Sequence, residues 1–148
     1  MPSNCKNILF VCSGNSCRSP MAEGIARSIA LCEGYSMDFR SAGTLGIEDA
    51  PATPEAILAA KEHGADISRH RSQALNQDNV CWADVIIGME YAHLESVKLF
   101  DIRGKKLMLL CSEEIEDPIG EDIGFYRAVA RQIAECLDKL LSKLENEA

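Results

Sequence analysis

A cysteine and an arginine six positions apart are the residues of this chain best suited to chemistry. Cys12 and Arg18 enclose a short segment that reads Cys-Ser-Gly-Asn-Ser-Cys-Arg. A guanidinium is a planar fork that donates paired hydrogen bonds to phosphate oxygens. A positive charge beside a thiol favours the thiolate, which is the nucleophilic form. The pair therefore predicts a phosphate-binding site in which Cys12 is the nucleophile and has a lowered pKa.

The segment also has the surroundings of an anion-binding loop. The apolar run 8–11 precedes it and a helical pattern begins at Arg18. Free backbone N–H groups and the helix dipole attract anions at a helix N-terminus. We expect Gly14 to supply the backbone conformation in which successive N–H groups converge. The expected phosphate-binding residues are Ser13, Gly14, Asn15, Ser16, Cys17 and Arg18.

The spacing of Cys12 and Arg18 is by itself a weak signal, because a chain with seven cysteines can match it by chance. The alternative is a buried structural cysteine beside an ordinary strand–helix turn. None of the other six cysteines has an arginine six residues later. The position of the match, between an apolar strand and a helix, favours the phosphate site.

A mechanism through a phosphocysteine also needs a proton donor for the leaving group. Asp117 is a candidate, since Pro118 after it restricts the local backbone and a helical pattern follows. On the residues alone, the Asp-Pro pair is as well explained by a plain turn.

Segments with strand and helix patterns alternate along the chain. The expected strands are 6–11, 37–40, 84–88 and 105–110, and the expected helices are 18–31, 53–63, 90–100 and 123–144. This alternation predicts an α/β fold, a single three-layer domain with a four-stranded parallel sheet and helices on both faces. Such sheets bind ligands beyond the carboxyl ends of their strands, where the Cys12–Arg18 segment follows the first strand.

The composition narrows the class of protein further. A chain of 148 residues, 47% hydrophobic, predicts one domain over residues 1–148. The net charge of −8 disfavours nucleic acid and anionic membrane as partners. No signal-peptide or membrane-span pattern is present, which predicts a cytoplasmic protein. The odd number of cysteines argues against a disulfide framework, and most of the thiols are expected to lie in the core. No CxxC pair is present, which argues against a structural metal site.

The run Cys12-Ser13-Gly14-Asn15-Ser16-Cys17-Arg18-Ser19-Pro20 resembles the signature of the low-molecular-weight protein tyrosine phosphatase family, and the resemblance extends from Ile8 to the final helix. It implies a phosphocysteine formed on Cys12, phosphate held by Arg18, and Asp117 as the acid. It also implies a phosphorylated protein as substrate, inorganic phosphate as product and no cofactor.

The same resemblance implies supporting roles around the loop. Asn15 would brace the loop through its amide, and Ser19 would hydrogen-bond the Cys12 thiolate. Ser41 and His70 match a serine and a histidine that lie behind the loop in the family.

Cys17 resembles a second cysteine that forms a reversible disulfide with the nucleophile in some family members. A nearby thiol can resolve an oxidised low-pKa cysteine, which favours a redox role over a passive loop thiol. In contrast, His63 and His93 are expected to be ordinary helix residues, at the surface or partly buried.

The loop resembles those of enzymes with three different activities. A phosphotyrosine phosphatase is the main interpretation, although aromatic residues that stack on the substrate are missing after Pro118 and in 42–50. A bacterial protein arginine phosphatase is the alternative. Ser16 has a hydroxyl where the resembling arginine phosphatases carry threonine and tyrosine phosphatases usually carry isoleucine, and 117–120 has their Asp-Pro-x-Gly pattern. A thioredoxin-coupled arsenate reductase is the third, but the two cysteines it needs are absent from 88–97. A catalytically inert phosphate-binding module would have no need of Cys12, Arg18 and Asp117 together.

Overall fold

The computed structural model describes residues 5–147 and contains four strands and five helices. The chain alternates between the two over most of its length, as the sequence predicts. The strands are β1 (Lys6–Cys12), β2 (Met37–Gly43), β3 (Val85–Gly88) and β4 (Lys106–Leu109). The helices are α1 (Arg18–Glu33), α2 (Pro54–Lys61), α3 (Gln77–Trp82), α4 (Tyr91–Val97) and α5 (Ile123–Glu145).

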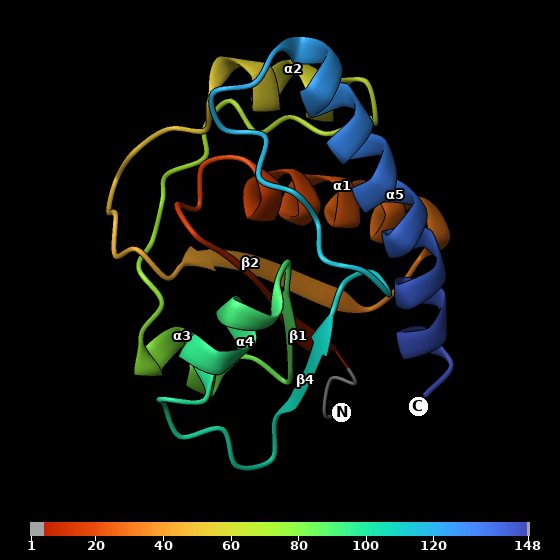
Figure 1. The fold of residues 1–148 in the computed structure, drawn as a ribbon. Coiled ribbons are helices and arrows are strands. Elements are labelled where there is room, and N and C mark those ends of the chain that lie inside the picture. The colour runs from red at the N-terminus through yellow and green to blue at the C-terminus, as the bar shows by residue number, and fades with distance from the viewer. Residues whose placement is uncertain (1–4, 148) are drawn as a thin grey trace.

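The four strands form one parallel sheet in the order β2-β1-β3-β4. Helices α1, α2 and α5 lie over one face, and the short helices α3 and α4 lie over the other (Figure 1). This arrangement confirms the predicted three-layer α/β fold. The central position of β1 places its carboxyl end, and therefore Cys12, in the middle of one edge of the sheet.

Alternation along β1 explains why its apolar run has no polar face. Ile8, Phe10 and Cys12 pack in the larger cluster under α1 and α5, whereas Leu9 and Val11 pack in the smaller cluster under α3 and α4. A parallel strand covered on both faces reads as a continuous apolar run for this reason. The side chain of Cys12 consequently points to the face from which α1 begins.

The helix α5 closes the larger cluster. Its buried positions form one apolar stripe along the helix: Tyr126, Val129, Ala130, Ile133, Leu137, Leu141 and Leu144. The side chain of Asp122 accepts a hydrogen bond from the Phe125 N–H at 2.9 Å and caps the helix. This cap fixes the point at which the segment that carries Asp117 ends. No helix within residues 5–147 is both long and apolar enough to cross a membrane.

Helix α3 was not predicted from the sequence. It has six residues, too few to show a helical apolar period, and it depends on a reciprocal cap. Asn76 and Asn79 each accept a hydrogen bond from the other's backbone N–H, at 2.8 and 3.0 Å. Trp82 at its end is half-buried and carries the Arg40 guanidinium 4.2 Å from its ring centroid.

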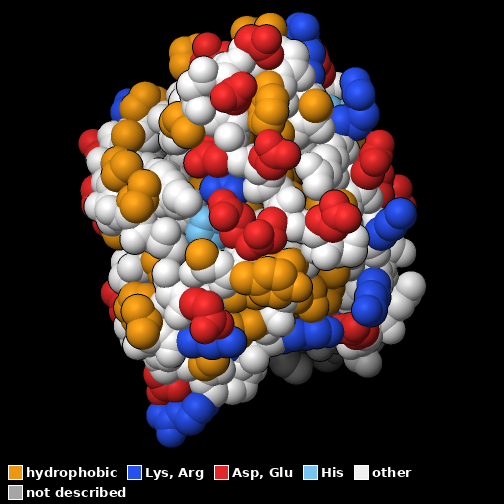
Figure 2. All heavy atoms as spheres, viewed as in Figure 1, with side chains coloured by type: hydrophobic (Ala, Val, Ile, Leu, Met, Phe, Trp, Pro, Cys, Tyr) orange, Lys and Arg blue, Asp and Glu red, His pale blue; other side chains and the backbone are white. Residues whose placement is uncertain are grey.

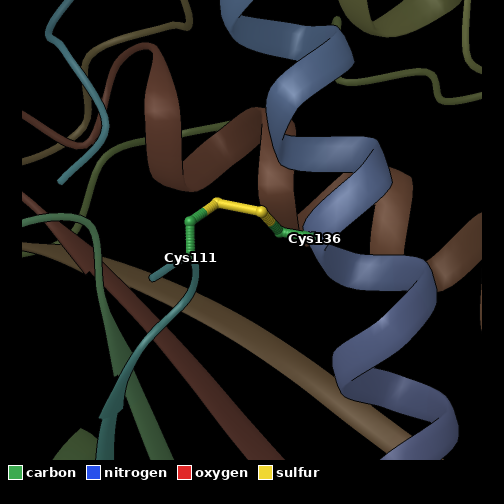
Figure 3. Close-up of a disulfide and its surroundings, with 2 residues drawn as sticks. All are labelled: Cys111 and Cys136. Atoms are coloured by element: carbon green, nitrogen blue, oxygen red, sulfur yellow. A yellow bond between two sulfur atoms is a disulfide. The ribbon is translucent and has the colours of Figure 1, made fainter. Parts of the chain in front are cut away.

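Cys111, just after β4, and Cys136, on α5, form a disulfide with a Cα–Cα distance of 5.6 Å (Figure 3). The expectation that the chain has no disulfide is therefore wrong. The two cysteines are 25 residues apart, and only the packing of α5 against the end of the sheet brings them together. The expectation of core thiols also fails for Cys32 and Cys81, which are exposed.

Candidate active site

The loop between β1 and α1 follows Cys12, the last residue of β1, and the side chain of Cys12 is buried. The neighbouring strand leaves room for the loop only because it ends in a glycine. A Cβ on Gly43 would lie 2.7 Å from the carbonyl oxygen of Ser13. Any larger residue at position 43 would push the loop out of place.

Asn15 is the residue that gives the loop its shape. Its φ of 55° is left-handed, a conformation that asparagine tolerates better than most residues, whereas Gly14 has no positive φ. The prediction that Gly14 supplies the special backbone conformation is therefore wrong. The fully buried amide of Asn15 donates to Ser19 Oγ at 2.8 Å and to Ser41 Oγ at 2.9 Å, and accepts from the Gln73 N–H at 2.9 Å.

Two further side chains hold the loop from behind. Ser41 Oγ donates to a carboxylate oxygen of Glu23 at 2.5 Å, and His70 Nε2 lies 2.8 Å from the carbonyl oxygen of Asn15. Ser41 and His70 thus occupy the places that the family resemblance implies. Glu23 was missed, since a glutamate on the first turns of a helix carries no signal of its own.

The Cys12 sulfur lies 2.8 Å from Ser19 Oγ, the contact that the resemblance implies. Burial raises the pKa of the Cys12 thiol above its usual 9.0. The Ser19 hydroxyl, the backbone N–H groups of Ser19 and Asn15, and the Arg18 charge act in the opposite direction. The predicted lowering of the Cys12 pKa is therefore wrong for this structure, because removal of the thiolate from water outweighs these contributions.

The partners of Arg18 explain why its charge helps Cys12 so little. Its Nη1 lies 2.5 Å from a carboxylate oxygen of Glu90 and donates to the carbonyl oxygen of Ile115 at 2.6 Å. Its Nη2 lies 3.5 Å from the Asp117 carboxylate and 3.4 Å from Ser13 Oγ. The carboxylates of Glu90 and Asp117 therefore offset the Arg18 charge, which was expected to stabilise the Cys12 thiolate. Glu90 was missed because it belongs to a different turn, after β3.

His93 was expected to be an ordinary helix residue, but it is buried against the loop. Its Nδ1 accepts from the Glu90 N–H at 3.0 Å, so its Nε2–H donates to Ser13 Oγ at 3.0 Å. Burial, followed by the Arg18 charge, lowers the pKa of His93 below its usual 6.5. The ring is therefore neutral, and its tautomer is set by the α4 N-terminus.

Asp117 lies in the segment between β4 and α5, half-exposed to solvent. Carboxylates gather along this segment on the face shown in Figure 2. Its Oδ1 accepts from the Ile119 N–H at 3.1 Å, which aims the side chain within its own turn. Together with Cys12 and Arg18, Asp117 lines a cavity of about 280 Å³. The geometry brings together the three residues that the sequence singles out for chemistry.

The mouth of this cavity is apolar. Leu45, Ile47 and Ile119 line it and are all strongly exposed. No tyrosine, phenylalanine or tryptophan is among the described residues that line it. Ser16 lies in the cavity wall, at the position whose residue type, by the family resemblance, differs between tyrosine and arginine phosphatases.

Cys17 is a free thiol that faces away from Cys12. Its sulfur contacts the Tyr126 hydroxyl at 3.2 Å and those of Thr53 and Ser16 at 3.6 Å. Burial and the Cys17 hydrogen bond raise the pKa of Tyr126 to about 12. Cys12 and Cys17 are not joined in this structure, so the redox role of Cys17 stays a prediction.

Metal ligands do not gather anywhere in the described part of the chain, where no three or more His, Cys, Asp or Glu residues form a group that could hold an ion. The fold and the loop together define a class of protein, a cysteine enzyme whose nucleophile sits at the base of an anion-binding loop at the carboxyl edge of a parallel sheet. Comparison with known proteins makes the class specific. The model of the low molecular weight phosphotyrosine protein phosphatase family matches residues 7–148.

The chain belongs to this family, and it is a cysteine-dependent phosphatase of the hydrolase class that acts on phosphomonoesters. It is 31% identical to a protein-arginine-phosphatase of Bacillus subtilis, over 95% of this chain and 98% of the relative. A tyrosine phosphatase structure from T. tengcongensis superposes with a TM-score of 0.88 at 34% identity, covering 93% and 99% of the two chains. An arsenate reductase of Staphylococcus epidermidis is 44% identical over 82 residues, 55% of this chain and 58% of the relative.

Proposed function

We propose that this phosphatase removes phosphate from protein side chains of the phosphotyrosine type through a phosphocysteine on Cys12. The observation that carries the proposal is the convergence of Cys12, Arg18 and Asp117 on one cavity. No metal and no cofactor enters the mechanism. The charge and composition favour a cytoplasmic protein whose partners are phosphorylated proteins, with no role for nucleic acid or membrane.

The first step transfers the phosphoryl group to sulfur. Backbone N–H groups of the loop and the Arg18 fork hold the phosphate oxygens. The Cys12 thiol, whose pKa is raised by burial, gives its proton to an oxygen of the entering phosphate dianion, and the resulting thiolate attacks phosphorus. The S–P bond forms as the bond to the leaving oxygen breaks, and Asp117 gives its proton to that oxygen. The dephosphorylated side chain departs from the exposed mouth of the cavity.

The second step returns the enzyme to its starting state. Asp117, now a carboxylate, takes a proton from water, whose oxygen attacks phosphorus and displaces Cys12 as the thiolate. The Ser19 hydroxyl, 2.8 Å from the sulfur, stabilises the charge that returns to it. Inorganic phosphate is the second product.

Phosphotyrosine suits the apolar mouth of the cavity. Leu45, Ile47 and Ile119 supply aliphatic surface for the edges and faces of the substrate ring. Aliphatic side chains bury ring area without the added attraction of stacked aromatic pairs, about 0.5–1.5 kcal/mol each. We therefore expect a broad preference for aryl phosphates.

Phosphoarginine is a second candidate that a specific observation favours. The Ser16 hydroxyl and the Asp117 carboxylate line the same cavity, and both can accept hydrogen bonds from a guanidinium. The B. subtilis relative named for this activity matches almost the whole chain. Arsenate reduction has less support, because Cys81 is exposed on α3 and Cys111 is already bonded to Cys136.

Matched peptides that carry phosphotyrosine or phosphoarginine at one position separate the two candidates. We expect a higher kcat/KM on the phosphotyrosine peptide, under reducing conditions. The variant Ser16→Ile removes the hydroxyl and adds apolar surface, so it should reduce arginine dephosphorylation and spare tyrosine dephosphorylation. A wild-type preference for phosphoarginine that Ser16→Ile abolishes would establish the second candidate instead. Activity retained by Cys12→Ser would refute the mechanism itself.

A further inference from the structure

A second cavity, of about 380 Å³, lies behind the phosphate loop, and four arginines line it. It is bounded by the first half of α1, the end of β2 and the segment 66–73. The four are Arg27, Arg40, Arg69 and Arg71. The chain has only eight arginines and a net charge of −8, so half of its arginine residues border one hollow.

Two of these arginines are balanced by carboxylates, and two are not. Arg27 pairs with Glu23 at 2.5 Å, and Arg71 lies at the 4.0 Å limit from Asp49. For Arg40 and Arg69, no carboxylate of the described chain lies within salt-bridge distance. The Arg40 guanidinium is stacked on Trp82, 4.2 Å from the ring centroid, so Arg69 is the arginine left without such a contact. A guanidinium at the edge of a cavity that has no paired carboxylate is suited to an anionic ligand.

Negative charge in the wall does not cancel the four arginines. Glu23 and Asp66 are the carboxylates that line the cavity. Because the Arg40 guanidinium is stacked on Trp82, the other three arginines leave an excess of one positive charge before His70 is counted. Glu23 is already committed to Arg27 and Ser41, and Asp66 accepts from the Ser68 N–H at 2.9 Å. The cavity is therefore a local positive site in an acidic protein.

We propose that this cavity binds a small anion with at least two phosphoryl groups in a row, an oligophosphate. Arginine forks on different walls can each hold a separate phosphoryl group, whereas one phosphate would occupy one or two of them. The volume lies within the range of small-molecule sites, about 300–1,000 Å³. An inorganic oligophosphate and a nucleoside triphosphate present the same chain of phosphoryl groups.

The proposed site is separate from the catalytic cavity. No residue lines both, and neither Cys12 nor Asp117 borders the arginine cavity. The two share only a wall, through the contacts of Ser41 and His70 with Asn15. Occupancy of one site can therefore be measured while the other is blocked.

Calorimetric titration of the orthovanadate-saturated protein with inorganic tripolyphosphate tests the proposal at low ionic strength, because vanadate occupies the phosphate loop. We expect one bound tripolyphosphate per chain and an affinity at least tenfold weaker in Arg69→Gln. The matched control is Arg131→Gln, which removes the same charge from the exposed side of α5 and should leave the affinity within twofold. Arg69 lies outside the catalytic cavity, so kcat/KM on p-nitrophenyl phosphate should not change.

A parallel titration of the same protein with ATP distinguishes a nucleoside triphosphate from an inorganic oligophosphate as the ligand. Equal affinity for ATP and tripolyphosphate would mean that the protein recognises the phosphoryl chain alone. If tripolyphosphate binds and ATP does not, the ligand is an inorganic oligophosphate. Both results support the site. Amide chemical shifts in segment 66–73 should move on titration, which provides a measurement that needs no variant. Absence of binding, equal affinity for orthophosphate, or an unchanged affinity in Arg69→Gln would overturn the proposal.

Discussion

Replacement of Asn15 by alanine should damage both the stability and the catalytic loop of this phosphatase. The Asn15 side chain makes three hydrogen bonds in a fully buried position, to Ser19, Ser41 and the backbone of Gln73. Each such bond contributes a net of about 0.5–1.5 kcal/mol to the free energy of unfolding. Alanine would also have to adopt the φ of 55°, which costs a further 1 kcal/mol or so.

These contributions add to a loss of roughly 3–5 kcal/mol for Asn15→Ala. Asn15→Gly loses the same hydrogen bonds without the left-handed strain, so it should lose about 1 kcal/mol less. Urea unfolding followed by circular dichroism, without reductant, measures both values. Because Ser19 loses its orienting partner, kcat should fall in both variants while KM changes less.

Asp49 provides the matched control for the backbone contribution. Among residues 5–147 it is the other non-glycine residue with a positive φ, 61°, and it is exposed. The difference between Asp49→Ala and Asp49→Gly should therefore also be about 1 kcal/mol, with no change in kcat. A loss below about 0.5 kcal/mol in Asn15→Ala would refute the view that this amide braces the loop.

Three further predictions concern the disulfide, the buried histidine and the acid. Replacement of Cys111 and Cys136 by serine opens a loop of 25 residues and should lower the free energy of unfolding by about 3 kcal/mol; an unchanged urea midpoint would contradict this. Because the native pKa of His93 is depressed, the unfolded chain binds a proton first, so stability should fall as the pH drops below 6.5, and His93→Gln should remove this part of the pH dependence. Asp117→Asn should lower kcat/KM, which reports the transfer of phosphate to Cys12, by about 10²–10⁴ on phenyl phosphate and much less on p-nitrophenyl phosphate, whose leaving group needs little protonation; equal losses of kcat/KM on both would argue against Asp117 as the acid.

Local sequence patterns were sufficient for most of the fold. The apolar residues of the strands predicted at 6–11 and 84–88, and the long apolar stripe of α5, are explained by burial in a parallel sheet that is covered on both faces. The boundaries differ by a few residues, because helix ends depend on caps such as Thr53 for α2. Helix α3 escaped prediction because six residues, with the reciprocal cap of Asn76 and Asn79 at the N-terminal end, carry almost no periodic signal.

The parts of the site that the sequence could not provide are contacts between distant segments. Glu90 and His93 belong to the turn after β3, and nothing in their neighbours reveals that Arg18 and Ser13 lie opposite. The disulfide between Cys111 and Cys136 is likewise a contact between segments that are distant in the sequence. The direction of the Cys12 pKa shift was wrong because burial of Cys12, which also depends on distant segments, raises the pKa more than the Arg18 charge and the hydrogen bonds lower it.

The contacts of Arg18 also indicate how the site prepares for substrate. A guanidinium held by Glu90 and the Ile115 carbonyl keeps its orientation before any phosphate arrives, so little conformational entropy is lost on binding. The longer 3.5 Å pair with Asp117 lies on the solvent side and is the weaker of the two. A phosphate that takes over the Nη2 donor would release Asp117 toward the leaving group. The two carboxylates around one arginine would then have different tasks, with Glu90 as a permanent support and Asp117 as the group free to carry a proton.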